Sequence, residues 1–183
     1  FFGAGGVFFQ LPDRVYSRYA VNDLDSSIIT FFRVLRDRPD DLVRVCELTP
    51  YAREEFIACL AKSDDPLEEA RRVWVRGRQG FAGKAASKGD WARPSSGGWY
   101  PTSASEKLLA LTTYARSLRN VAVDCIDARE FVAKWGGEGV FCYLDPPYVP
   151  EARKVESYEH EMDADDHRAL AAELHAAVGR GAK

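Results

Sequence analysis

The sequence has little net charge, only four cysteines and no long apolar run. Its 25 Lys and Arg residues stand against 28 Asp and Glu, a formal net charge of −3, so a nucleic acid has to bind to a local basic patch. The cysteines form no C-x-x-C pair, and we interpret them as reduced, buried thiols of a cytosolic protein. No apolar run approaches the roughly 18 residues of a membrane-spanning helix, and no signal peptide is visible.

The chain does contain enough apolar residues for one folded domain. Of its 183 residues 46% are hydrophobic, including ten Phe, eight Tyr and four Trp, which provide one core but not two full domains. It opens on Phe-Phe-Gly-Ala-Gly-Gly (residues 1–6), a pattern typical of a strand that ends in a glycine turn, and it stops abruptly at Lys183. We therefore expect a fragment that is truncated at both ends.

The most informative stretch runs from residue 139 to residue 150. Residues 140–144 form a continuous β-branched, aromatic and apolar run, which predicts a strand buried on both faces of a parallel sheet. Asp145 then lies at the carboxyl end of this strand, where open α/β sheets hold ligands. Pro146 and Pro147 fix two successive φ angles, so the turn that carries the carboxylate is stiff.

These residues provide groups that suit a planar ligand bearing an NH2 group. The Asp145 carboxylate and the Pro146 carbonyl accept the amine hydrogens, while the ring of Tyr148 stacks on the base. An amine held in this way becomes nucleophilic without first losing a proton. The alternative is an ordinary strand-to-turn junction, because Asp and Pro are common in turns, and these four residues alone do not decide between the two.

Asp-Pro-Pro-Tyr at 145–148 is the motif of amino-methyltransferases that use S-adenosylmethionine, and the chain resembles the Dam-like DNA adenine-N6 methyltransferases. Phe1, Gly3 and Gly5 match the family motif F-x-G-x-G, which the resemblance implies wraps the methionine end of S-adenosylmethionine. Asp23 matches the second motif of the family. An acidic residue about 20 residues after a glycine turn is also the usual partner of ribose hydroxyls.

Two of these acidic residues have competing interpretations. Asp23 could instead cap the helix that follows it, although Asp25 is able to do so. Asp127 aligns with the acidic residue that, in the family, meets the adenine of the cofactor. Asp127 and Glu130 also form a capping box, so capping and cofactor contact both stay open.

The composition changes in the middle of the chain. Between Arg71 and Arg93 there are seven basic residues and one acidic residue, with interspersed glycines and aromatic residues, as a loop that follows a phosphate backbone requires. We expect residues 66–103 to be an inserted DNA-recognition segment within a partial catalytic domain formed by residues 1–65 and 104–183.

The resemblance also assigns DNA recognition to this segment, commonly around the signature Asn-Arg-x-x-Phe-Asn-Gly. The sequence retains the Arg, Phe and Gly of that signature at 78, 81 and 83 and lacks both Asn residues. A solvated loop without DNA contacts is the alternative. The candidate DNA-binding residues are Arg76, Arg78, Phe81, Lys84 and Lys88.

Strands predicted around Tyr19, Val123 and Cys142 alternate with helices, which indicates an α/β fold. The resemblance makes this the three-layer, Rossmann-like methyltransferase fold. Cap patterns predict helices that begin at Thr49-Pro50, at Asp65-Pro66, at Ser103, at Asp127 and at Asp163. The acidic and histidine residues around Asp163 are interpreted as that helix cap and not as a metal site.

The motifs together predict a DNA adenine-N6 methyltransferase that flips the target base of double-stranded DNA and transfers the methyl group directly, without a metal or covalent intermediate. Alternatives are methylation of cytosine N4, of an RNA base or of a protein glutamine, or a non-catalytic DNA-binding remnant. A restriction endonuclease of the same system is a further expected partner, in the cytoplasm of a prokaryote or in a virus of a prokaryotic host. We expect methylation by the full-length protein and weak S-adenosylmethionine binding by this chain, because a lysine-bearing upstream motif also contacts the cofactor in the family.

Overall fold

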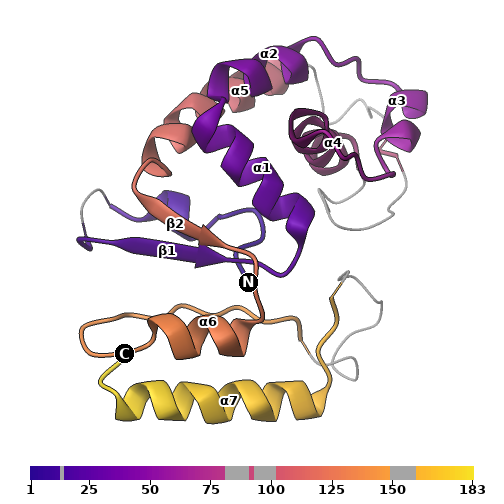
Figure 1. The fold of residues 1–183 in the computed structure, drawn as a ribbon. Coiled ribbons are helices and arrows are strands. Elements are labelled where there is room, and N and C mark those ends of the chain that lie inside the picture. The colour runs from indigo at the N-terminus through magenta and orange to yellow at the C-terminus, as the bar shows by residue number, and fades with distance from the viewer. Residues whose placement is uncertain (13–14, 81–90, 93–101, 149–159) are drawn as a thin grey trace.

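The computed structural model describes residues 1–12, 15–80, 91–92, 102–148 and 160–183, with the side chains of 102–107 excepted. The elements in chain order are η1 (Phe8–Gln10), β1 (Tyr19–Asn22), α1 (Ser26–Asp37), α2 (Pro39–Glu47), α3 (Arg53–Ala58), α4 (Pro66–Gln79), α5 (Thr102–Ser117), β2 (Val121–Asp124), α6 (Ala128–Trp135) and α7 (Ala164–Gly179). Figure 1 shows α1 to α5 on one side of the two strands and α6 and α7 on the other side.

The two strands form a small parallel sheet. Tyr19 lies opposite Val121, and Asn22 lies opposite Asp124. The Asn22 side chain ties the ends of the strands together, because its Nδ2 donates to the Ile126 carbonyl at 2.9 Å and its Oδ1 accepts from the Ile126 N–H at 3.0 Å. The predicted strands around Tyr19 and Val123 are confirmed, and both lead directly into acidic residues at the same edge of the sheet.

The third predicted strand, residues 140–144, is wrong. The structure assigns no strand there. Among the described residues, the Cys142 N–H donates to the Lys183 carbonyl and the Lys183 N–H to the Val140 carbonyl, both at 2.8 Å, and the Val140 N–H donates to the Gly137 carbonyl at 3.1 Å. Phe141 and Tyr143 are 57% and 58% exposed, so one face of the segment is open. The other face packs on α6 and α7. An apolar run predicts an extended backbone, but it does not supply the neighbouring strands.

Most predicted helix starts are confirmed by their caps. The Asp25 carboxylate accepts from the Ser27 N–H at 2.8 Å at the start of α1, which leaves the Asp23 side chain available for another role. Asp65 caps α4 with Pro66 in its first turn, and Asp163 forms a complete capping box at α7. The cap predicted at Ser103 lies among side chains that are not described.

Two features of the helical part differ from the prediction. Helix α2 was not predicted, although Pro39 begins it and two acidic residues occupy its first turn, as is favourable at the positive end of a helix. Thr49 does not begin a helix: its hydroxyl donates to the Val45 carbonyl at 2.6 Å and so closes α2, while α3 begins at Arg53.

The main core lies between α1, α2, α4 and α5, where the side chains of Leu35, Leu42 and Leu118 are completely buried. Removing such a side chain from water contributes about 1.5–3 kcal/mol to folding, so these helices form one packed unit. Of the helices in the described ranges, none is long and apolar enough to cross a bilayer.

The four cysteines are free thiols. Cys46 and Cys59 are buried as predicted, and burial raises the pKa of the Cys46 thiol to about 12 and that of Cys59 to about 11. Cys125 and Cys142 are only partly buried, which corrects the prediction for these two. All four pKa values are raised by burial, so none of these thiols is activated as a nucleophile.

Candidate functional site

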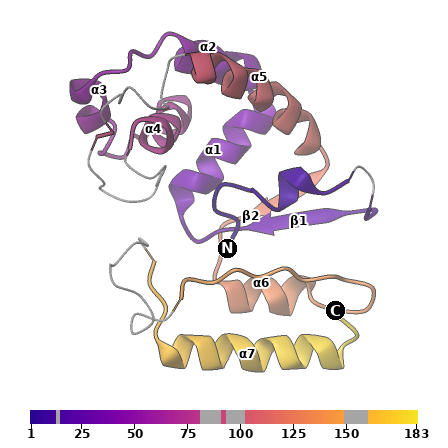
Figure 2. The same cartoon turned by 180° about the vertical axis from the view of Figure 1, so that it is seen from behind.

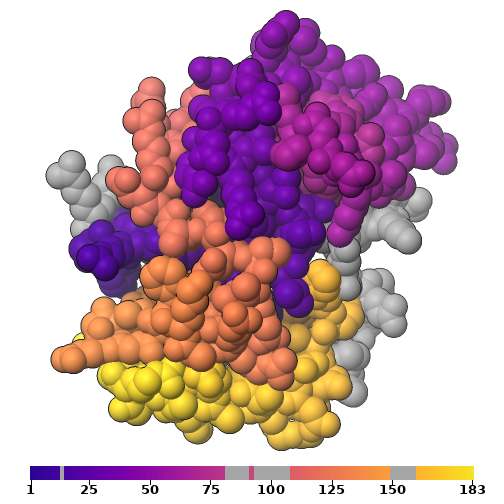
Figure 3. Space-filling model, in the orientation of Figure 1, coloured from indigo at the N-terminus to yellow at the C-terminus, as the bar shows by residue number. Residues whose placement is uncertain are grey.

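A cavity of about 1380 Å³ lies where both strands end, between the sheet and the segment that leads to Asp145. In the space-filling view, the part of the chain that contains α1 meets α6 along a seam across the molecule (Figure 3). The residues that the sequence predicted and that line this single cavity are Phe1, Gly3, Gly5, Asp23, Arg78, Asp127, Asp145 and Pro147. Residues separated by up to 146 positions thus come together, as the order of the motifs predicted.

The glycine turn is connected to the end of β1 through Asp23. The Gly3 N–H donates to Asp23 Oδ2 at 2.7 Å, and the Asp25 N–H donates to Asp23 Oδ1 at 3.0 Å. Gly3 and Gly5 have φ angles of +52° and +70°, which L side chains rarely adopt. The Asp23 carboxylate therefore positions the turn, and each of its oxygens keeps a lone pair that can accept a further hydrogen bond.

Aromatic side chains pack against the glycine turn. A Cβ atom on Gly5 would lie 2.6 Å from Phe9 Cε2 and 3.0 Å from Phe2 Cζ, so glycine is required there for space as well as for φ. Phe9 in turn stacks on Tyr114 of α5, with ring centroids 4.3 Å apart. The backbone of the turn is thus fixed against the core, which favours a preformed ligand site.

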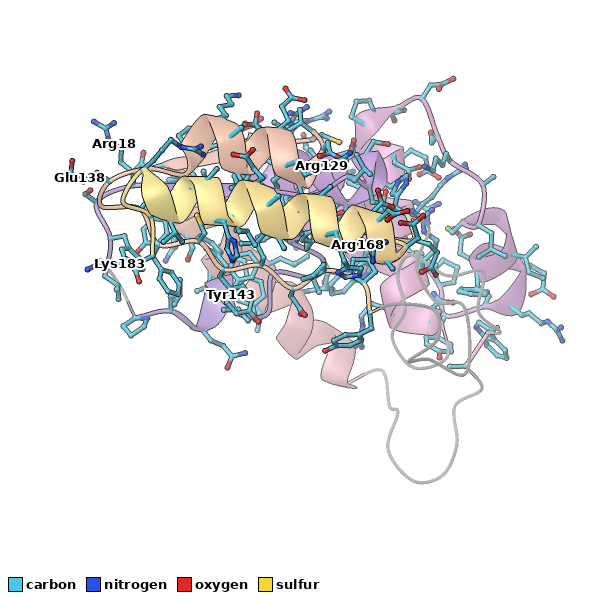
Figure 4. All side chains as sticks on the ribbon, turned by 90° about the horizontal axis from the view of Figure 1, so that it is seen from below. Arg18, Arg129, Glu138, Tyr143, Arg168 and Lys183 are labelled. Carbon is cyan, nitrogen blue, oxygen red and sulfur yellow. The ribbon has the colours of Figure 1, made fainter. Side chains whose placement is uncertain are left out.

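Asp127 caps α6 and is also paired with an arginine. Its Oδ1 accepts from the backbone N–H of Arg129 at 2.8 Å, and its two oxygens accept from Arg129 Nε at 2.9 Å and NH2 at 3.1 Å. The side-chain hydrogen bonds from Arg129 are the main reason that the pKa of Asp127 lies below its usual value. Seen from below, Arg129 and Arg168 lie at one end of the α6–α7 pair and Lys183 at the other (Figure 4). The N-cap at Asp127 is confirmed, but the described contacts do not include the bond from the Asp127 N–H to the Glu130 side chain that would complete a capping box. Cofactor contact by Asp127 stays a prediction.

The turn at 145–148 presents its polar groups to the open side. Asp145 is exposed and lines the cavity, Pro147 is buried, and Tyr148 is 63% exposed. Asp23 and Asp145 both line this cavity. The catalytic carboxylate predicted from the sequence and the predicted cofactor-binding carboxylate therefore face one region.

The basic segment contains fewer available charges than its composition implied. Arg71 and Arg72 both bind Glu68, at 2.7 Å and 2.8 Å. Arg76 is buried and donates to the Cys59 carbonyl at 2.9 Å and to Glu69 at 3.1 Å. We therefore correct the prediction for Arg76, because its guanidinium fastens α4 inside the protein and cannot reach a phosphate.

Arg78 has a different environment. Its guanidinium carbon lies 5.6 Å from the centroid of the Trp74 ring, both residues line the cavity, and burial lowers the pKa of Arg78. Trp74 is not among the site residues that the sequence predicts. The signal for the pair was its i, i+4 spacing, which puts the two side chains on one helix face.

The remaining predicted DNA-binding residues, Phe81, Lys84 and Lys88, lie outside the described residues. The chain on either side of them is fixed: Gly80 and Trp91 form an antiparallel bridge, and the Ala92 N–H donates to the Gln79 carbonyl at 2.7 Å. Gly80 and Trp91, which flank residues 81–90 in the sequence, thus lie next to each other at the end of α4.

The cavity is lined by charged and aromatic residues. Its acidic residues include Asp23, Asp25, Asp127 and Asp145, its arginines are Arg18, Arg78 and Arg129, and aromatic residues come from the glycine turn, α1, α4 and α6. Carboxylates favour a cationic or hydroxyl-bearing ligand, and aromatic faces favour a planar base. Within the described ranges, no three His, Cys, Asp or Glu side chains are arranged to hold a metal ion.

These features define a mixed α/β protein with a cavity at the carboxyl ends of two parallel strands, where such sheets commonly hold ligands. The chain belongs to the D12 class N6 adenine-specific DNA methyltransferase family, whose pattern it matches over residues 1–182. The resemblance inferred from the motifs is thereby confirmed.

Individual relatives agree with the family. The chain is 28% identical over 177 residues to the Type II methyltransferase M1.LlaDCHI of Lactococcus lactis subsp. cremoris, covering 88% of this chain and 60% of that protein. It is 28% identical over 164 residues to the DNA adenine methylase of Serratia marcescens, and 26% identical over 163 residues to that of Escherichia coli K12. Both alignments cover 82% of this chain, and they cover 56% and 55% of those relatives. The chain thus spans little more than half the length of these proteins.

Proposed function

We propose that the protein carrying this chain transfers a methyl group from S-adenosylmethionine to the N6 amine of adenine in double-stranded DNA. The observation that carries this proposal is the convergence of the glycine turn, Asp23 and Asp145 on one cavity. Family membership supports the substrate and the reaction. At about 1380 Å³, the cavity is larger than the roughly 300–1,000 Å³ of a typical small-molecule site, which leaves room for a cofactor and an inserted base.

The residues that line the cavity suit S-adenosylmethionine. The turn from Phe1 to Gly5 offers backbone groups to the methionine end, Asp23 accepts from ribose hydroxyls, and Asp127 lies next to β2 for the adenine of the cofactor. The carboxylates favour the positive charges of the amino and sulfonium groups. When bound, the cofactor supplies an electrophilic methyl group.

The residues at 145–148 hold the acceptor amine. We propose that the Asp145 carboxylate and the Pro146 carbonyl accept the two hydrogens of the amine and so direct its lone pair toward the methyl donor. Buried Pro147 keeps the turn in place, and the exposed ring of Tyr148 is available for stacking on the base. Catalysis then rests on positioning and electrostatics.

DNA reaches this site by base flipping, which costs a few kcal/mol of lost stacking and pairing. We propose residues 66–103 as the recognition segment, with contacts from Arg78, Phe81, Lys84 and Lys88. The position of Arg78 at the cavity supports its role, because this residue connects the segment to the site of chemistry.

We further propose that the strands and helices form the three-layer, Rossmann-like fold of such enzymes. The parallel sheet with helices on both sides supports this assignment (Figure 1). We place the reaction in the cytoplasm of a prokaryote or of its virus-infected cell, since the relatives are bacterial. A restriction endonuclease of the same system stays a prediction.

The test is transfer of labelled methyl from S-adenosylmethionine to unmethylated duplex DNA. The protein is compared with Asp145→Ala and with Asp41→Asn, which alters an exposed carboxylate of α2 that pairs with Arg38 and is not among the residues that line the cavity. We expect label on DNA with the unmodified protein and with Asp41→Asn, and a loss of about 100-fold or more with Asp145→Ala. Equal label from all three proteins refutes the role of Asp145. Cofactor binding without label on DNA points to an RNA or protein substrate, and no cofactor binding points to a non-catalytic DNA-binding protein.

A further inference from the structure

Asn22 is a buried polar residue that lies outside the predicted site residues. It is the last residue of β1, it is only 6% exposed, and it lines the cavity. Figures 1 and 2 show the two strands pointing the same way, with the chain running from the end of β2 to α6. The strand pairing ends at Asn22 and Asp124, so it does not extend to the acidic residues that follow.

The side-chain amide of Asn22 continues the link between the two segments beyond the sheet. Its Nδ2 donates to the Ile126 carbonyl, and its Oδ1 accepts from the Ile126 N–H. One planar side chain thus pairs with both backbone polar groups of a residue 104 positions away. Among the described residues no backbone–backbone hydrogen bond reaches Ile126, so these two bonds hold the connection from β2 to α6 against the end of β1.

The two residues that are joined in this way directly precede two carboxylates of the cavity. Asp23 follows Asn22, and Asp127 follows Ile126. None of the hydrogen bonds that these carboxylates accept from described residues connects one segment with the other. The amide of Asn22 is therefore the hydrogen-bonded link nearest to both carboxylates, and it sets how far apart they lie.

We propose that Asn22 is a positioning residue, which fixes the spacing of Asp23 and Asp127 for the nucleoside part of S-adenosylmethionine. The inference rests on the proposed function, in which Asp23 accepts from the ribose hydroxyls and Asp127 lies beside the adenine. Ribose and adenine are covalently joined, so two groups that bind them both contribute fully only when their own separation is already correct.

This role requires an amide at position 22. An amide carries a donor and an acceptor on one planar group, as the two backbone groups of Ile126 require. An aspartate of similar shape would set an acceptor against the Ile126 carbonyl, and an alanine would leave both backbone groups without a partner.

The experiment is a double-mutant cycle on S-adenosylmethionine binding, measured by calorimetry. Asn22→Ala is combined with Asp127→Ser, which shortens the side chain but retains a group that can cap α6. We expect Asn22→Ala to weaken binding about tenfold when Asp127 is present and about twofold or less when it is replaced, because the spacing matters only while both carboxylates are there. Asn120→Ala, which alters the exposed asparagine just before β2, should leave binding unchanged.

Amide hydrogen exchange, measured by NMR without ligand, tests the two bonds themselves. In Asn22→Ala the Ile126 amide should exchange about tenfold faster or more, whereas the amides that join β1 to β2 should change by about threefold or less. Faster exchange throughout both strands would show that Asn22 stabilises the whole sheet and does not position one connection.

The binding data separate this inference from the proposed function. Equal weakening with and without Asp127 would overturn the inference, because Asn22 would then act on the fold alone. Unchanged exchange at Ile126 would overturn it as well. Unmodified protein that binds no S-adenosylmethionine would overturn the inference together with the proposed cofactor. Coupling between Asn22 and Asp127 without methyl transfer to adenine would support the inference and contradict the proposed function.

Discussion

Three glycines of the first turn allow a test of how that turn is built. Gly3 has a φ of +52°, and an alanine Cβ there would have no heavy atom within 4 Å. Gly3→Ala should therefore lower the free energy of unfolding by about 1–2 kcal/mol, through the left-handed backbone alone. Alanine at Gly5 has the same backbone cost, and its Cβ would also lie 2.6 Å from the ring of Phe9. Phe9 cannot move freely because it stacks on Tyr114 at 4.3 Å. Overpacking of this kind adds about 1–3 kcal/mol.

We therefore expect Gly5→Ala to be less stable than Gly3→Ala by about 1–3 kcal/mol. The reduced entropy of the unfolded chain favours both variants by about 0.4–1 kcal/mol and cancels in the difference. Gly6→Ala is the matched control, since Gly6 has an ordinary φ and open space around its Cβ. It should be neutral or slightly stabilising.

The assay is urea unfolding followed by circular dichroism and by aromatic fluorescence, with midpoints and slopes compared across the three variants. Equal destabilisation by Gly3→Ala and Gly5→Ala, within about 0.5 kcal/mol, would refute the packing of Phe2 and Phe9 against the turn. A destabilised Gly6→Ala would show that the local geometry is different from that described.

Two further predictions concern α4. Hydrogen bonds from Arg71 are the main cause that lowers the pKa of Glu68 to about 2, so its contribution to stability is present above pH 4.5 and is lost as the pH falls toward 2. Unfolding measured from pH 7 to pH 3 should show Glu68→Gln less stable than the unmodified protein by about 1–2 kcal/mol at pH 7. This difference in the free energy of unfolding should narrow below pH 4.5, and a difference that stays constant would contradict the assignment. Arg76→Met should cost about 3 kcal/mol, because it leaves Glu69 buried without its partner. Arg78→Met should instead reduce the salt dependence of DNA binding by about one ion. A loss of stability in Arg78→Met together with a reduced salt dependence in Arg76→Met would refute the distinction between a structural Arg76 and a DNA-binding Arg78.

The sequence was informative where a local rule decides the structure. Caps at Asp25, Asp65 and Asp163 depend on a side chain and on backbone groups two or three residues later, and all three formed as predicted. The motif order predicted which distant residues meet, because strands in a parallel sheet end at the same edge.

The sequence was less informative where partners are distant. The count of basic residues that started at Arg71 omitted Glu55, Glu68 and Glu69, which lie outside the counted window. These glutamates pair with Arg71, Arg72 and Arg76. Burial of residues 140–144 required neighbouring strands that an apolar pattern does not specify. Arg129 as the partner of Asp127 was also missed, since both sequence interpretations considered only backbone groups and the cofactor.

The chemical identity of the methylated nucleoside tests the central claim most directly. Duplex DNA treated with the protein and labelled S-adenosylmethionine is digested to nucleosides, which are separated and counted. Family membership predicts label in N6-methyladenine, and the proposed role of Asp145 predicts none when Asp145 is replaced by alanine. Label in N4-methylcytosine would agree with the proposed mechanism but contradict adenine as the target base. Label that persists without the Asp145 carboxylate would contradict the proposed catalytic site.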